Sequence, residues 1–129
     1  MRNTSKIGNV TTAKVLAALM ENGKTVLVPF GDGLRYDLLI DEGDRFVRVQ
    51  CKTGKLKSGC VAFRNYSVTG TGRRRYGVEV DAFGVYCPQT KKCYLVPVVE
   101  CAAWGTKLRV EPAKNGQTKD IRDAGKFEI

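Results

Sequence analysis

Apolar side chains recur at helical spacing near the start of the chain, at Ile7, Val10, Ala13, Leu16, Ala17 and Met20. Because every third or fourth residue of an α-helix lies on the same face, this spacing predicts an amphipathic helix over residues 5–22. Ser5 is a candidate N-cap, and Gly23 suits the left-handed conformation in which helices often end. One helix is therefore expected to open the fold.

After Gly23 the pattern changes to short apolar segments separated by turn residues. Strands are expected at residues 25–28, 36–40, 45–53, 60–66, 81–86, 93–98 and 108–110. The turn signal at residues 41–44 predicts that the second and third strands form a hairpin. Residues 67–77 are expected to form a loop and residues 99–104 a short helix. This order predicts an α/β (α+β) fold built around one sheet.

The third expected strand alternates between apolar and polar residues. Its apolar positions are Val47, Val49 and Cys51, and its polar positions are Arg48, Gln50 and Lys52. Since successive side chains of a strand point to opposite faces, the strand should bury one face and present the polar groups on the other.

The length of 129 residues fits a single domain over residues 1–129. No apolar run is long enough to cross a bilayer, and the N-terminus leads into no apolar signal-peptide region. The expected location is therefore cytoplasmic, either nucleoid-associated or, for a phage-encoded protein, in the host cytoplasm, with no membrane partner.

Positive charge dominates, with 22 Lys and Arg against 13 Asp and Glu and a formal net charge of +9. A basic domain favours nucleic acid as partner, because each Lys or Arg that neutralises a phosphate releases counterions. An anionic membrane surface is the rival partner, but no amphipathic helix carries a lysine-rich polar face.

The chain has five cysteines in no CxxC spacing and no histidine. This composition argues against a zinc site and favours cysteines that act as small buried hydrophobes in a reducing compartment. Without histidine, any general base must be a carboxylate, a lysine or a metal-bound water.

Candidate chemistry lies on the expected hairpin, which can bring Asp37 beside Gln50 and Lys52. Mg²⁺ prefers oxygen ligands and keeps several waters. Asp37 can supply a charged oxygen and Gln50 an amide oxygen, with the backbone carbonyl of Cys51 as a third ligand. Such a metal activates water and stabilises charge on a phosphate, and Lys52 can orient the water or offset negative charge. The triplet alone is weak, because most Asp and Lys residues on strands are solvated.

The surrounding motifs make the pattern far more specific. They are residues 29–40 (PFGDGLRYDLLI), 48–53 (RVQCKT), 74–77 (RRYG), 80–88 (VDAFGVYCP), 94–97 (YLVP), 108–110 (LRV) and 115–117 (NGQ). Over nearly the whole chain they resemble the PD-(D/E)XK endonucleases related to group I intron homing enzymes. The chain is also similar to archaeal-type Holliday junction resolvases.

This resemblance implies a restriction-endonuclease-like fold, with a mixed central sheet flanked by helices. It implies that Asp37 bridges Mg²⁺ or Mn²⁺, that Gln50 stands where many relatives carry Glu, and that Lys52 is the family lysine. The family usually has a Glu on the first helix near the metal, and this helix has no acid before Glu21. Asn9 or Thr12 is expected to face the site instead.

The candidates for DNA contact are Arg48, Lys55, Lys57, Arg73, Arg74, Arg75 and Tyr76. The arginine run lies in a Gly-rich segment, which can approach a phosphate backbone closely. Arg48 shares the face of Gln50 and Lys52 and can hold a phosphate. Trp104 is expected in the core or at a dimer interface, and not as a platform on which bases stack.

Three functions remain open. The first is a homodimeric (or tetrameric) Mg²⁺-dependent endonuclease that resolves branched DNA, because two-fold symmetry matches a four-way junction. The second is a homing endonuclease of the group I intron type that cuts a specific site in double-stranded DNA. The third is a DNA-binding module that has lost catalysis. Fold alone does not fix the substrate.

Overall fold

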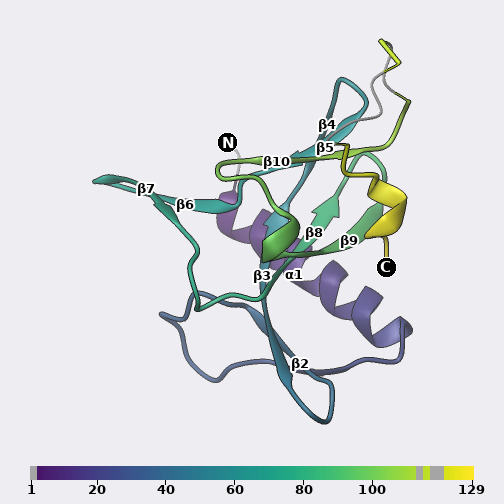
Figure 1. The fold of residues 1–129 in the computed structure, drawn as a ribbon. Helices are drawn as coiled ribbons and strands as arrows, with labels where there is room; N and C mark the ends of the chain where they lie inside the picture. Colours follow the sequence, from purple (N-terminus) through teal and green to yellow (C-terminus); the bar gives the residue numbers. More distant parts are fainter. Residues whose placement is uncertain (1–2, 113–114, 117–120) are drawn as a thin grey trace.

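A computed structural model describes residues 3–112, 115–116 and 121–129, apart from the side chain of Thr69. Gln117, one of the residues that carry the family resemblance, lies outside the described residues. The elements are α1 (Thr4–Glu21), β1 (Thr25–Leu27), β2 (Leu38–Asp41), β3 (Phe46–Thr53), β4 (Lys55–Lys57), β5 (Cys60–Phe63), β6 (Tyr66–Thr69), β7 (Gly72–Arg75), β8 (Ala82–Cys87), β9 (Lys92–Pro97), the 3₁₀ turn η1 (Val98–Glu100), β10 (Thr106–Arg109) and the 3₁₀ turn η2 (Ala124–Lys126) (Figure 1).

The helix α1 begins after Asn3, whose Oδ1 accepts a hydrogen bond from the Lys6 N–H at 3.0 Å. Asn3 is therefore the N-cap, and the expectation that Ser5 caps the helix was wrong by two residues. Both Asn and Ser can cap a helix, so the residue types alone did not decide between the two positions. At the other end, Gly23 has φ +78° and its N–H donates to the Met20 carbonyl. The predicted glycine stop is confirmed.

The main sheet has five strands in the order β1-β2-β3-β8-β9. The pair β3–β8 is parallel and the other pairs are antiparallel. The predicted hairpin of β2 and β3 is confirmed, with Leu38 opposite Val49 and Ile40 opposite Val47. This hairpin positions the candidate site, because β3 carries the polar residues Arg48, Gln50 and Lys52 on one face.

Two smaller sheets were not predicted. One has the order β10-β5-β4, and the other is the hairpin of β6 and β7. The expectation of a loop over residues 67–77 was wrong, since Ser67 pairs with Arg74 and Val68 with Arg73. These short polar strands carry no clear apolar alternation, which is the main sequence signal of a strand. The expected helix over residues 99–104 is also wrong, because only the turn η1 forms there.

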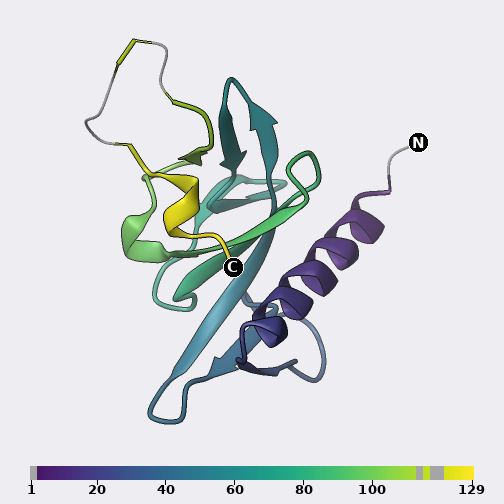
Figure 2. The same cartoon turned by 90° about the vertical axis from the view of Figure 1, so that its right-hand side faces the viewer.

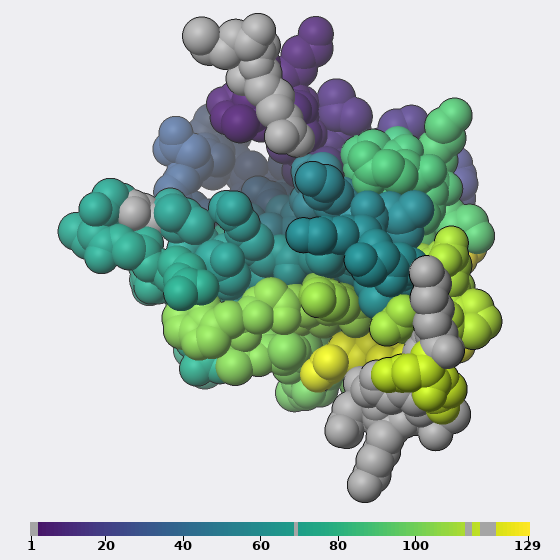
Figure 3. All heavy atoms as spheres, turned by 90° about the horizontal axis from the view of Figure 1, so that it is seen from above, coloured from purple at the N-terminus to yellow at the C-terminus, as the bar shows by residue number. Residues whose placement is uncertain are grey.

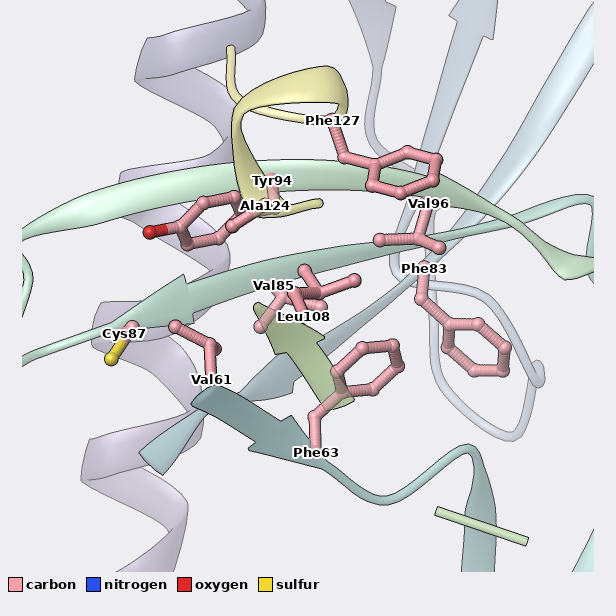
Figure 4. Packing of buried hydrophobic residues seen from close by; sticks show 10 residues of the cluster. All are labelled: Val61, Phe63, Phe83, Val85, Cys87, Tyr94, Val96, Leu108, Ala124 and Phe127. Atoms are coloured by element: carbon pink, nitrogen blue, oxygen red, sulfur yellow. The ribbon is translucent and has the colours of Figure 1, made fainter. Parts of the chain in front are cut away.

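The sheet is covered differently on its two faces. Helix α1 packs on one face, and the second sheet with η2 covers the other (Figure 2). The fold is the mixed α and β arrangement expected from the sequence, but helices do not flank both faces. On the second face Phe63, Val85 and Leu108 belong to a cluster that η2 joins through Ala124 and Phe127 (Figure 4).

On the first face α1 approaches the sheet closely at Gly84 of β8. A β-carbon at Gly84 would lie 2.6 Å from Val15 Cγ1 of the helix and 3.0 Å from Val49 Cγ1 of β3. Both valines are fully buried. A glycine is therefore needed at this position, where the helix meets the strand that carries the candidate site.

The five cysteines are free thiols, and Cys101 alone among them is not fully buried. Their role as small hydrophobes agrees with the sequence analysis. In the described part of the chain, no helix has the length and apolar character required to cross a bilayer.

Candidate active site

Asp37 stands directly before β2, where the ladder between β2 and β3 ends. Its main-chain N–H donates to the Val49 carbonyl at 2.8 Å, and its Oδ2 accepts from the Cys51 N–H at 2.8 Å. The carboxylate thus takes the place that a further residue of β2 would have filled. Burial raises the pKa of Asp37, and the Cys51 N–H and the Lys52 ammonium act against that shift.

The Cys51 carbonyl belongs to the same edge of β3. In a strand the N–H and C=O of one residue point the same way, so a Cys51 N–H directed at Asp37 places the carbonyl on that side as well. Gln50 and Lys52 are half-buried on the face of β3 opposite the buried side chain of Cys51. The structure therefore brings the predicted residues Asp37, Gln50, Cys51 and Lys52 to one end of the hairpin.

Lys52 is held from two sides. Its Nζ donates to the Tyr66 carbonyl at 3.1 Å and to Tyr76 Oη at 3.1 Å, and it lies 4.8 Å from the centroid of the Tyr76 ring. Burial lowers the pKa of Lys52 to about 8, with Arg35 and Arg64 adding to the shift and Asp37 opposing it. Nζ can therefore carry or release a proton near neutral pH.

The residue Arg35 completes this cluster and was missed in the sequence analysis. Its guanidinium lies 3.9 Å from the centroid of the Tyr76 ring, and its Nη2 donates to the Arg75 carbonyl at 3.3 Å. Its buried Nε is 3.4 Å from Glu79 Oε1, an ion pair without hydrogen-bond geometry. In the sequence, the position of Arg35 two residues before Asp37 was a weak sign that it belongs to the site. Nothing in the sequence pointed to Glu79.

The donor set fits a hard divalent cation. Asp37, Gln50 and the Cys51 carbonyl can offer three oxygens, and no hydrogen bond among the described residues engages Asp37 Oδ1. The described residues contain no group of three His, Cys, Asp or Glu side chains able to bind a metal. With one carboxylate, a cation bound here would need further oxygen ligands, such as water, to complete its coordination shell.

Asn9 and Thr12 are the residues of α1 that were expected to face the site. Asn9 is exposed, and Thr12 Oγ1 donates to the Gly8 carbonyl at 3.1 Å. Burial raises the pKa of the Cys51 thiol to about 12, and a hydrogen bond from Thr12 partly offsets this. Thr12 is therefore on the Cys51 side of β3, opposite Gln50 and Lys52. Asp32 is exposed and lines, with Asp37, a pocket of about 240 Å³.

The expectation that Arg48 holds a phosphate is not supported by the structure. Its Nε and Nη2 donate to the two carboxylate oxygens of Asp81 at 2.9 and 3.1 Å, and its main-chain N–H donates to Asp81 Oδ2. Such a bidentate pair already compensates the charge of the guanidinium. Lys55 and Lys57 are exposed at alternate positions of β4, so they share one face.

The arginine run lies on a hairpin that projects from the body of the molecule (Figures 1 and 3). Arg73 and Arg75 lie over the Trp104 ring, at 5.3 and 4.9 Å from its centroid. Arg74 points to the opposite face and is 4.0 Å from Glu79. Trp104 is 45% exposed, so its expected place in the core was wrong. Tyr76 is half-buried, and its hydroxyl accepts a hydrogen bond from Lys52.

Comparisons with known proteins agree with this fold. The profile of the PD-(D/E)XK endonuclease family matches residues 2–129. Among solved structures, the chain is similar to a bacterial homing endonuclease, I-Ssp6803I, with a TM-score of 0.73 and 22% identity over 98% of this chain and 89% of that one. At this identity the likeness concerns the fold. No curated protein gives a significant match.

Proposed function

Because this chain belongs to the PD-(D/E)XK endonuclease family, we propose that it hydrolyses phosphodiester bonds of DNA with the help of Mg²⁺ or Mn²⁺. The observation that carries the proposal is the hydrogen bond from Cys51 to Asp37, which aligns the carboxylate with the end of β3 that bears Gln50 and Lys52. We also propose that residues 1–129 form one domain, because the family profile matches residues 2–129.

The cation would be held by Asp37, Gln50 and the Cys51 carbonyl. When bound, it supplies an activated water and stabilises charge on the phosphate. Asp37 contributes the negative charge of the site, and Gln50 an oxygen without charge. We therefore expect weak cation binding in free protein and tighter binding when a DNA phosphate is present.

The protein's own contribution to the reaction centres on Lys52. Its Nζ can hold a proton and donate it toward a phosphate oxygen, or release that proton as the pH rises toward its pKa of about 8. Tyr76 and the Tyr66 carbonyl orient Nζ, since both accept its hydrogen bonds. Arg35, stacked on Tyr76, keeps that ring in place.

We propose branched DNA, such as a four-way junction, as the first candidate substrate. A homodimer or tetramer would match its symmetry. A specific site in duplex DNA is the second candidate, favoured by the likeness to a homing endonuclease. One small domain spans few base pairs, so recognition of a long site also requires an oligomer. Neither substrate follows from the fold alone.

The test is metal-dependent nicking of a labelled four-way junction and a labelled linear duplex, each with Mg²⁺ or with EDTA. The native protein is compared with Lys52→Ala and with Lys24→Ala, a matched change at an exposed lysine beyond the end of α1. We expect cutting by native protein and Lys24→Ala only, and only with the cation. Paired cuts confined to the junction would support a resolvase.

Cutting of specific duplex sites instead would support the second candidate. Tight DNA binding without cutting of either DNA or of a library of duplex sequences would overturn the nuclease proposal and leave a DNA-binding module. Equal cutting by native protein and Lys52→Ala would remove Lys52 from the proposed chemistry.

A further inference from the structure

A groove of about 580 Å³ opens beside Lys52, and it shares no lining residue with the pocket that Asp37 and Asp32 line. Its lining residues come from the end of β3, from β4 and β5, and from the segment that leads into β10; those used below are Lys55, Phe63, Arg64, Trp104 and Lys107. Arg64 and Lys107 have no part in the proposed catalytic site. The groove therefore continues from Lys52 of the proposed catalytic site toward Arg64 and Lys107.

The charge of the groove is positive and uncompensated. Lys52, Lys55, Arg64 and Lys107 line it, and no Asp or Glu does. Among the ion pairs formed within the described part of the chain, none involves Lys55, Arg64 or Lys107. Arg64 is also close enough to Lys52 to lower its pKa, as burial does more strongly. Such a surface attracts a chain of phosphates that ends at Lys52.

The groove also has an aromatic and apolar component. Trp104 is 45% exposed and lines it together with Ala62 and the buried Phe63. The indole is held in place, because Tyr66 packs against it edge-on at 5.5 Å between centroids and Arg75 lies over it. A duplex presents phosphates to a protein surface but keeps its bases stacked. An exposed, fixed indole is therefore useful to an unpaired base and adds little for a duplex.

We propose that this groove binds a single-stranded segment of DNA next to the phosphodiester that is cut. Phosphates lie against Lys55, Arg64 and Lys107, and a base contacts Trp104. The inference rests on the proposed function for the role of Lys52 at the end of the groove. It implies that a site with an unpaired strand, as at a branch or a locally opened duplex, is bound more tightly than continuous duplex.

The sequence contains one tryptophan and five tyrosines, so fluorescence excited at the long-wavelength edge, where only tryptophan absorbs, reports on Trp104 alone. The full chain in EDTA, which prevents cutting, is titrated with an octathymidylate, with an abasic strand of the same length and with a blunt hairpin duplex. We expect the octathymidylate to quench the emission, the abasic strand to bind more weakly without quenching, and the duplex to leave the emission nearly unchanged.

Variants identify the contacts. Arg64→Ala and Lys107→Ala should each reduce the salt dependence of octathymidylate binding by about 0.7 in log–log slope, as expected for one lost phosphate contact on a single strand. Lys24→Ala, outside the groove, should leave the slope unchanged. Trp104→Ala, followed by anisotropy of a labelled strand, should weaken binding about 5- to 100-fold. Trp104→Phe should retain most of the affinity and serves if the alanine variant does not fold.

The inference is overturned if the octathymidylate binds no better than the abasic strand and leaves the emission unchanged, or if the duplex quenches equally. Either result leaves the proposed nuclease intact, because cutting of junction or duplex is measured separately. Conversely, quenching by single strand in a protein that cuts no DNA would support the groove and refute the proposed function.

Discussion

The two faces of β3 differ in polarity and in burial. Toward α1 it presents Val49, which is fully buried, with Val47 and Cys51 at 9% exposure. Toward the second sheet and the β6–β7 hairpin it presents Gln50 and Lys52, which are half-buried and polar. The first face gains stability from burial of apolar area. The second holds polar and charged groups where solvent is partly excluded.

Burial acts against the charged form of both ionisable groups at the polar end. It raises the pKa of Asp37 and lowers the pKa of Lys52 to about 8. Their mutual attraction opposes both shifts without cancelling them. The apolar face therefore supplies stability, whereas the polar face holds two ionisable groups whose charged forms burial disfavours.

The largest expected effect is on Asp37. Asp37→Asn keeps an oxygen that can accept from the Cys51 N–H but removes the charge that binds a cation, so we expect cutting to fall by about 10³-fold or more. The same variant should unfold at higher urea concentration at pH 7, because burial raises the pKa of the native carboxyl and so disfavours its charged form. Activity and urea unfolding are measured on one preparation. Lower stability in the variant would mean that the carboxylate supports the fold.

The second prediction concerns the apolar face. Gly84→Ala would force a β-carbon to within 2.6 Å of Val15 Cγ1, so we expect a loss of about 1–3 kcal/mol in the free energy of unfolding. Gly8→Ala is the matched control, because Gly8 lies in α1 with no atom within 4 Å of its added β-carbon. It should gain about 0.5–1 kcal/mol. Equal stability of the two variants in urea would show that α1 shifts freely away from the sheet.

The third prediction separates positioning from binding. Tyr76→Phe removes the hydroxyl that accepts from Lys52 Nζ and leaves the ring under Arg35. We expect kcat to fall about tenfold, the size of one hydrogen bond to a charged group, with the DNA Kd unchanged. Tyr86→Phe, on the α1 side of the sheet, is the control and should retain native kcat. A matching change in Kd, with kcat preserved, would assign Tyr76 to DNA contact.

The last prediction is a trend with pH. Lys52 has a native pKa of about 8 against its ordinary value of 10.5, so the unfolded chain binds more protons between these values. The free energy of unfolding of the unmodified protein, taken relative to that of Lys52→Met, should therefore be lowest below about pH 8 and should rise toward pH 10.5. Urea unfolding in EDTA measures this, with Lys24→Met as the parallel surface control. A difference that is constant over this range would mean that Nζ is not buried in solution.

Much of the architecture could be predicted from local signals. The first helix, the glycine that ends it and the alternation along β3 are set by neighbouring residues and are confirmed. The apolar set that predicted the helix does not mark its buried face: the helix buries Thr11, Val15 and Leu19, whereas Val10 and Met20 are 45% and 61% exposed. The pairing of β2 with β3 followed from a short turn. The β6–β7 hairpin did not follow, because its strands are short and polar; its arginines contact Trp104 and Glu79, which lie far away in the sequence or outside the hairpin.

For the candidate site, the sequence by itself determined which groups lie on one face of β3, because alternation along a strand is a property of the backbone. It also determined the positive charge and the family. Only the tertiary structure decided which charges are free. It pairs Arg48 with Asp81, stacks Arg35 on Tyr76, and leaves Arg64 and Lys107 without ion pairs in the described chain beside an exposed Trp104. These outcomes depend on contacts between residues far apart in the sequence, whose distances no local pattern encodes.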